Sequence, residues 1–183
     1  RASLRTESPR LESGGITRAG MAIAKACYDT LRKYGKAAIA ACENNVVTPA
    51  LDAIIEATVY LSGVGADNVN CAAPHSFYNG VTSLGGHEAY HGNCVAFGTL
   101  IQLTLECADK AEFEDIQNFC LEVGLPITLA ELGDFTDEDL HTIAKNACVK
   151  GETIHNLAGD VTPDELYAAI IATDALGKAR LGK

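Results

Sequence analysis

Hydrophobic residues recur at three- and four-residue intervals along most of the chain, from Gly20 to the C-terminus. This spacing is typical of helices that bury one face, and no segment of useful length alternates with the period of two that marks a strand. Residues 91–107 are hydrophobic on nearly every face, so we expect that helix to be central. The pattern predicts helices over residues 17–35, 36–45, 48–65, 91–107, 111–124, 136–151 and 162–183.

Capping signals mark the ends of several of these helices. Thr48 and Thr162 are each followed by proline, which suits the first helical position. Thr136 stands three residues before Asp139, the spacing of a capping box. Gly35 is expected to end the first helix. Together these signals predict an all-α fold, a bundle of about seven helices.

Charge and composition argue against several kinds of partner. The 183 residues carry 14 Lys and Arg against 24 Asp and Glu, a formal net charge of −10, so we expect no nucleic-acid partner. No apolar run has membrane-spanning length and the N-terminus lacks a signal-peptide core, so we expect no membrane association. The seven cysteines are widely spaced without C-x-x-C, which favours small buried hydrophobes in a reducing, cytoplasmic compartment.

The two ends of the chain differ in character. Residues 1–18, which open with RASLRTESPRLESGG, are expected to form a polar N-terminal arm or remnant, and residues 19–183 one helical domain. The chain begins with Arg1, and this opening looks like the middle of something larger. No strand–glycine–helix unit with G-x-G-x-x-G or GxxxxGK[ST] occurs, so we expect no dinucleotide site within the chain.

One short motif suggests zinc chemistry. Residues His87 to His91 match H-E-x-x-H, which on a continuous helix places two imidazoles on zinc beside the general base of a peptidase. Glycines flank the motif on both sides and are poor helix formers. A third ligand would have to come from a residue such as Glu112 or Glu114, which nothing else nominates. A zinc peptidase is therefore a remote alternative.

A second arrangement pairs His75 with His91. Each borders a predicted helix, and the small residues around them leave room for a metal ion and a substrate. The competing interpretation is that both are ordinary polar residues near helix ends. We expect His141 and His155 to have structural roles. Tyr78 and Tyr90 are expected to pack in the core, with orientation of a ligand as the alternative.

Several long segments, in order, resemble the C-terminal half of glycerol dehydrogenases, which belong to the iron-containing (group III) alcohol dehydrogenase superfamily. The resemblance runs from about Gly20 to the C-terminus and rests on long stretches rather than one short pattern. The segments are VVTPALDAIIEATVYLSGVG, CAAPHSFYNGVTSLGGHEAYHGNCVAFGTLIQLTLE, VGLPITLAEL, and KGETIHN followed by VTPDELYAAIIATD.

The resemblance implies a metal site shared between two domains. Members have an N-terminal α/β domain that binds NAD and a C-terminal helical domain, with a divalent metal, zinc in glycerol dehydrogenases, held by one Asp and two His. The family's A-A-x-H-x-x-x-N-G segment matches Ala72–Gly80 and implies that His75 is a ligand. Its HG-x-x-V-A-F-G segment matches His91–Gly98 and implies the same for His91, so His87 is left out.

The resemblance also implies the reaction, the oxidation of glycerol to dihydroxyacetone with hydride transfer to NAD. The family's Asp ligand and its NAD-binding domain would lie upstream of this sequence. We therefore expect the isolated chain to bind metal weakly and to have negligible activity. Three departures concern the substrate pocket: Tyr78 stands where many relatives have a second His, Pro74 replaces a small residue, and Ala66 replaces an aromatic one.

A non-catalytic helical module derived from this family, serving as a scaffold or oligomerising unit, is the main alternative. A helical domain without its partner domain should expose an apolar patch. We therefore expect the chain to form a homo-oligomer, as family members do.

Overall fold

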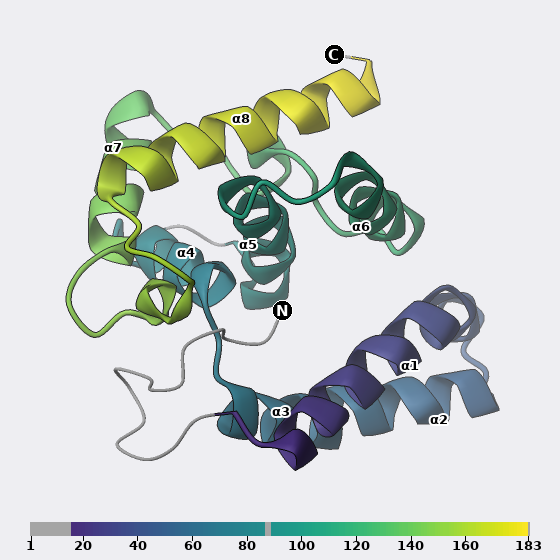
Figure 1. Cartoon of the computed structure of the whole chain (residues 1–183). Coiled ribbons are helices and arrows are strands. Elements are labelled where there is room, and N and C mark those ends of the chain that lie inside the picture. The colour runs from purple at the N-terminus through teal and green to yellow at the C-terminus, as the bar shows by residue number, and fades with distance from the viewer. Residues whose placement is uncertain (1–15, 87–88, 183) are drawn as a thin grey trace.

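The structure, a computed structural model, describes residues 16–86 and 89–182. These residues form helices and no strand (Figure 1). The all-α prediction is confirmed. The α-helices are α1 (Arg18–Glu43), α2 (Pro49–Glu56), α3 (Ser62–Val69), α4 (Ala73–Thr82), α5 (His91–Leu105), α6 (Lys110–Glu122), α7 (Asp137–Ala147) and α8 (Pro163–Leu181). The shorter helical turns are η1 (Ala57–Leu61), η2 (Leu129–Glu131) and η3 (Thr153–Asn156).

Helices α2 and α3 are joined by η1 without a break, so the three form one continuous helix. Counted in this way, the described residues agree with the prediction of about seven helices. Ala57 and Ser62, the residues at the two junctions, both have right-handed helical dihedral angles. Between them the chain forms a π-helical turn, in which the backbone N–H of Ser62 donates to the carbonyl of Ala57. The Cys27 thiol on α1 lies 3.5 Å from the same carbonyl oxygen.

The prediction that Gly35 ends the first helix is wrong. Helix α1 continues through Gly35 to Glu43 and includes the segment predicted as a separate helix. Gly35 is buried, and a Cβ atom there would lie 3.3 Å from the Phe119 ring of α6. This glycine therefore makes space for a neighbouring helix. In the sequence, a glycine of this kind looks the same as a glycine that ends a helix.

Helix α5 lies at the centre of the fold, as its apolar character predicts. It packs against α4, α6 and α8, and Phe97, Leu100 and Ile101 on it are fully buried. The main core cluster joins α5 to α4, α7 and α8 through side chains that include Phe77, Ile143 and Ile170. This cluster stabilises the part of the molecule that carries both candidate histidines.

Helices α1, α2 and α3 with η1 form a hairpin that lies to one side of the remaining helices (Figure 1). Helix α2 has no buried residue, so the hairpin has little core of its own. Arg32 connects it to α6: its guanidinium lies 2.6 Å from the Asp115 carboxylate and 4.6 Å from the centroid of the Phe119 ring. A few specific contacts of this kind therefore attach the hairpin to the core.

The predicted helix starts are confirmed. The hydroxyl groups of Thr48, Thr136 and Thr162 each accept a hydrogen bond from a backbone N–H of the following turn. Two of these are full capping boxes, in which Asp139 and Glu165 accept from the cap residue in return. The bond from the Thr162 backbone N–H lowers the pKa of Glu165.

The expectation that the cysteines are buried is only partly correct. All seven are free thiols, but only Cys94 and Cys120 are buried, while Cys42 and Cys107 are exposed. Burial raises the pKa of Cys94 and of Cys120 to about 11, so both stay protonated at neutral pH and act as small apolar side chains.

None of the helices in residues 16–86 and 89–182 is both long enough and apolar enough to cross a membrane.

Candidate metal site

The N-terminal end of α4 carries the first candidate ligand. The chain leaves α3 at Asn70, whose φ of 60° and ψ of 173° lie in a region that residues other than glycine rarely adopt. Helix α4 then begins at Ala73 with Pro74 in its first turn, where the missing N–H removes no helical hydrogen bond. His75 therefore lies in the first turn of a well-defined helix, and its side chain is half-buried.

Helices α4 and α5 come unusually close because of Gly98. A Cβ atom on this residue would lie 2.7 Å from the Cα of Pro74, a separation that real Cβ atoms do not show. The rings of Phe77 and Phe97 pack beside this point with their centroids 5.7 Å apart, and both are fully buried. This close contact fixes how the start of α4 lies against α5.

The two candidate histidines meet across this helix pair. The ring centroids of His75 and His91 are 5.3 Å apart. Tyr78, one turn after His75 on α4, packs edge-on against His91 with a centroid separation of 4.4 Å. His91 is the first residue of α5 and is exposed, so one side of the pair is open to solvent.

Buried hydroxyl groups hold the backbone around His75. The Ser76 hydroxyl accepts a hydrogen bond of 2.6 Å from the backbone N–H of Ile154, and it lies 2.9 Å from the Thr153 hydroxyl. Thr153 in turn donates to the carbonyl of Ala72 at 2.9 Å. These hydrogen bonds connect η3 to Ala72 and Ser76, which lie on either side of His75. Ser76 is fully buried, so no water competes for its hydroxyl.

Amide side chains complete this connection. Asn156 donates to the carbonyl of Cys71 at 2.9 Å, and Asn79 donates to the Glu152 carboxylate at 2.8 Å. Asn79 is the asparagine of the A-A-x-H-x-x-x-N-G segment but had no assigned role, and Glu152 and Asn156 were not singled out from the sequence. The available signal was the segment KGETIHN, residues 150–156, which belonged to the resemblance without an assigned role.

Cys71 is a further residue that sequence reasoning missed at this site. Its Sγ lies 3.7 Å from Nε2 of His75, one turn away along the chain. A thiol and two imidazoles are donors that zinc accepts readily. Within the described part of the chain, however, no group of three or more His, Cys, Asp or Glu side chains is arranged to hold a metal ion.

The donors that are present nevertheless fit a transition-metal ion. Two imidazoles that bind one zinc ion, through bonds of about 2.0–2.1 Å, must have their rings close together, as His75 and His91 do. Protein zinc sites ordinarily use at least three protein ligands. The pair of His75 and His91 alone falls short of that number.

The H-E-x-x-H motif does not lie on one continuous helix. His87 and Glu88 lie outside the described residues, but Tyr90 is extended, with φ −62° and ψ 139°, and α5 begins only at His91. The peptidase arrangement needs both histidines one turn apart on a single helix. Tyr90 is also 80% exposed, so the expectation that it packs in the core is wrong.

The other histidines have structural surroundings, as predicted. His141 is exposed, and its ring stacks on Tyr167 with a centroid separation of 4.0 Å. Nε2 of His155 lies 3.2 Å from the carbonyl oxygens of Cys148 and Val149, at the end of α7. Neither residue lies in the group formed by Cys71, His75 and His91.

The chain matches no protein-family model, but it is similar to characterised proteins along nearly its whole length. It is 44% identical over 182 residues to a glycerol dehydrogenase of Pseudomonas putida, with 97% of this chain and 50% of the relative covered. It is 45% identical over 181 residues to a glycerol dehydrogenase of Escherichia coli O6:H1, with 97% of this chain and 49% of that relative covered.

A solved structure gives the same result. The crystal structure of a probable glycerol dehydrogenase from Sinorhizobium meliloti superposes with a TM-score of 0.85 at 40% identity, over 91% of this chain and 48% of the other. The chain thus spans about half the length of the curated relatives it matches. Sequence and fold together show that the chain is homologous to glycerol dehydrogenases over about half of their length.

Proposed function

We propose that residues 19–183 are the metal-binding, substrate-side domain of a zinc-dependent, NAD-linked glycerol dehydrogenase that oxidises glycerol to dihydroxyacetone. The observation that carries this proposal is the proximity of the His75 and His91 rings, whose centroids are 5.3 Å apart, in a chain that is 44% identical to a glycerol dehydrogenase. Of the predicted polar arm or remnant, residues 1–18, residues 1–15 lie outside the described part of the chain, and Arg18 is already the first residue of α1.

The chain's own residues would bind and orient. His75 and His91 would hold the ion as neutral imidazoles, and the edge of Tyr78 would limit rotation of the His91 ring. A bound divalent ion supplies a Lewis acid that lowers the pKa of a substrate hydroxyl. The open side of the pair, at exposed His91, is where substrate and the NAD-binding half would meet these ligands.

The 183-residue chain on its own would bind zinc weakly and have negligible activity. The described residues bring two imidazoles together, whereas a stable site takes at least three protein ligands. A ligand and the NAD site from the other half of such an enzyme would complete the centre.

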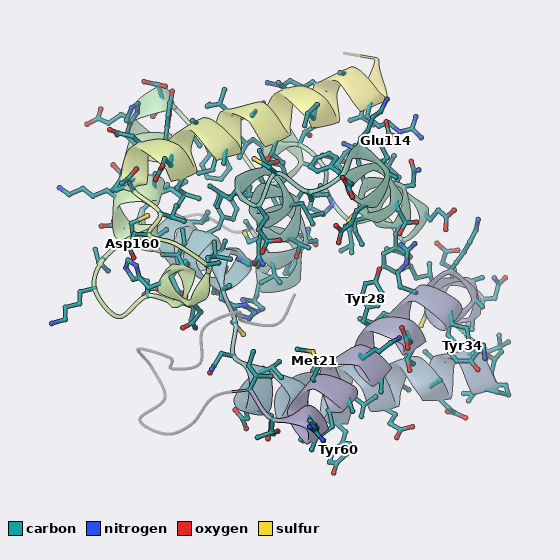
Figure 2. All side chains as sticks on the ribbon, in the orientation of Figure 1. Met21, Tyr28, Tyr34, Tyr60, Glu114 and Asp160 are labelled. Atoms are coloured by element: carbon teal, nitrogen blue, oxygen red, sulfur yellow. The ribbon has the colours of Figure 1, made fainter. Side chains whose placement is uncertain are left out.

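We also propose that the chain self-associates. Met21, Tyr28 and Tyr60 are between 43% and 62% exposed, and they project from the hairpin of α1–α3 (Figure 2). Large exposed apolar side chains favour contacts with another protein surface. A single monomeric species in light scattering, at every concentration tested, would contradict this part of the proposal.

Zinc titration of the chain separates the three functional hypotheses. We expect His75→Ala and His91→Ala each to weaken zinc binding by about tenfold or more, and the matched variant His87→Ala to leave it unchanged. Loss of binding in His87→Ala and His91→Ala with none in His75→Ala would instead support a zinc peptidase. No zinc binding in the unaltered chain would favour a non-catalytic scaffold.

Activity is tested by joining the chain to the N-terminal half of the Pseudomonas putida glycerol dehydrogenase. We expect glycerol-dependent reduction of NAD by this chimera, and a fall of at least about 100-fold in His75→Ala and in His91→Ala. Full activity in either variant would refute the assigned roles. The variant His141→Ala, an exposed histidine remote from the pair, is the control.

A further inference from the structure

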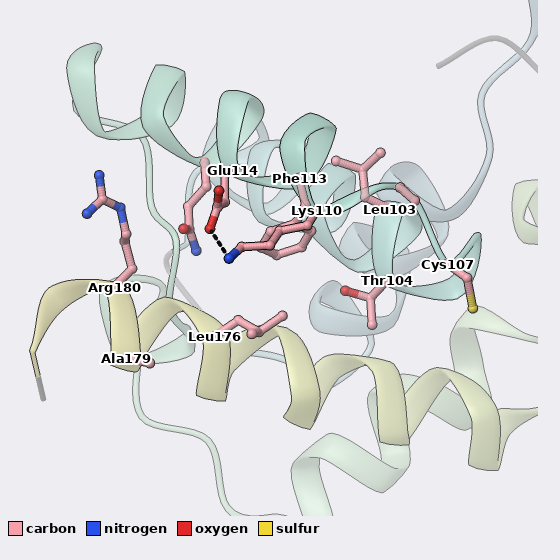
Figure 3. Close-up of a pocket in the computed structure, with 11 residues that line it drawn as sticks. Leu103, Thr104, Cys107, Lys110, Phe113, Glu114, Leu176, Ala179 and Arg180 are labelled. Carbon is pink, nitrogen blue, oxygen red and sulfur yellow. Dashed lines mark ion pairs between the residues drawn. The ribbon is translucent and has the colours of Figure 1, made fainter.

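A cavity lies at the opposite end of α5 from the candidate metal site. It has a volume of about 520 Å³ and is lined by the C-terminal part of α5, α6 and the last turns of α8 (Figure 3). Sites for small molecules typically measure roughly 300–1,000 Å³. Since His91 begins α5 and Leu103 and Thr104 are near its end, the cavity is separate from the histidine pair.

Most of the cavity wall is apolar. Leu103 from α5, Phe113 from α6 and Leu176 from α8 face it from three sides (Figure 3). Leu176 is 49% exposed, so the cavity has an open mouth beside α8. Such a wall favours an aliphatic or aromatic group over a sugar or a nucleotide phosphate.

One buried polar atom in this wall has no hydrogen-bond partner. Gln117 on α6 lines the cavity and is only 3% exposed, yet its Nε2 atom makes no hydrogen bond. A buried amide donor that is left unpaired is uncommon because the loss of water is not compensated. An oxygen atom of a ligand in the cavity would compensate it.

A cation also lines the cavity. Arg180 on α8 also lines the cavity, and its guanidinium donates a hydrogen bond of 2.7 Å to the side chain of Asn118, the neighbour of Gln117. The Arg180 guanidinium has further N–H groups that can bind an acceptor. The one carboxylate in the cavity wall, on Glu114, pairs with Lys110 at 3.6 Å. This end of the cavity therefore suits a negatively charged oxygen ligand.

We propose that this cavity is a binding site for a medium-chain carboxylate, such as a fatty acid. The carboxylate lies between the Arg180 guanidinium and the Gln117 amide, and the alkyl chain lies along Phe113, Leu176 and Leu103. The site is independent of the proposed dehydrogenase function, because it uses none of the residues around His75 and His91.

Calorimetric titration of the 183-residue chain with hexanoate, octanoate and decanoate tests this site. We expect saturable binding of one molecule per chain, with affinity that increases about fourfold per added methylene until the cavity is full. Decan-1-ol and decyltrimethylammonium, which lack the carboxylate, are expected to bind about tenfold more weakly than decanoate.

Substitutions locate the binding. Arg180→Gln and Gln117→Leu should each weaken decanoate binding by about tenfold or more, and Ala179→Trp, which adds bulk at an exposed position in the wall, should block it. Lys145→Gln removes a cation from the exposed side of α7 and should change nothing. Binding that does not saturate, that ignores the charge of the head group, or that is unaffected by all three cavity substitutions would overturn the proposal.

Discussion

Ser76 is not a candidate ligand, yet its buried hydroxyl helps to position one. Its hydroxyl is fully buried, accepts from the Ile154 backbone and contacts the Thr153 hydroxyl. His75 is its neighbour in sequence, so the same hydrogen bonds that satisfy these buried groups also fix the backbone of the candidate ligand. In this way the segment after α7 contributes to the site without supplying a ligand.

Removing this hydroxyl should affect both stability and metal binding. Ser76→Ala leaves the buried N–H of Ile154 without a partner, which should lower the free energy of unfolding by about 1–3 kcal/mol. Zinc affinity should also fall by roughly 10- to 100-fold, as for other residues that orient a metal ligand. Urea denaturation and zinc titration measure the two effects.

The matched control is Ser62→Ala, because the exposed Ser62 hydroxyl bonds only to the Thr58 carbonyl within the same continuous helix. We expect it to change stability by no more than about 0.5 kcal/mol and zinc affinity not at all. Equal effects from the two substitutions would mean that the buried network does not position His75.

The sequence predicts the histidine pair but not the residues that hold it. His75 and His91 were nominated because long segments resemble a known family, whereas their spacing alone left them equivalent to polar residues at helix ends. Thr153 and Asn156 bond to Ser76, Ala72 and Cys71, at or just before the first turn of α4, although they lie more than 70 positions away in the sequence. A contact at that separation leaves no local pattern, so only the folded chain reveals it.

Buried glycines also limit how well helix ends can be predicted from the sequence. Gly35 and Gly98 both lie inside helices and both admit a neighbouring helix, through Phe119 in one case and Pro74 in the other. The sequence analysis interpreted Gly35 as a helix end because glycine is common there. The helix periodicity and the N-caps at Thr48, Thr136 and Thr162 were predicted correctly, because those properties are local.

Gly98 should be intolerant of a side chain. In Gly98→Ala the new Cβ meets the Pro74 backbone, so α4 must move away from α5, at a cost of about 1–3 kcal/mol in the free energy of unfolding. Gly92→Ala, in the same helix, meets nothing within 4 Å and should be neutral or stabilising by up to about 1 kcal/mol. Thermal unfolding of the two variants compares them, and similar stabilities would show that the helices do not need this close approach.

The chain as a whole consists of a well-packed core and a less buried hairpin. The core contains α4, α5, α7 and α8, with both candidate histidines, whereas α1–α3 join it through contacts such as Arg32 with Asp115 and Phe119. Segments with few buried apolar contacts open more readily than the core. The hairpin is thus the part whose position depends on the fewest interactions.

Arg32→Ala should therefore loosen the hairpin selectively. The ion pair with Asp115 and the contact with the Phe119 ring are together expected to contribute about 1 kcal/mol. Amide hydrogen exchange in α1–α3 should become about fivefold faster, while exchange in α5 and α8 stays the same. Lys25→Ala, which removes an exposed pair within α1, is the control. A uniform acceleration across the whole chain would contradict this division.

The π-helical turn at Ala57–Leu61 determines which residues of α3 face α1, because α3 continues the same helix. Residues both before and after the turn pack against α1, and beyond it Gly65 lies where a Cβ would be 3.6 Å from the Cα of Ala24. One residue fewer would rotate the later part by about 100°, so a bulkier neighbour would replace Gly65 at that contact. The number of residues between Pro49 and Gly65 is therefore constrained as tightly as their identity, even though most of them are exposed or only half-buried.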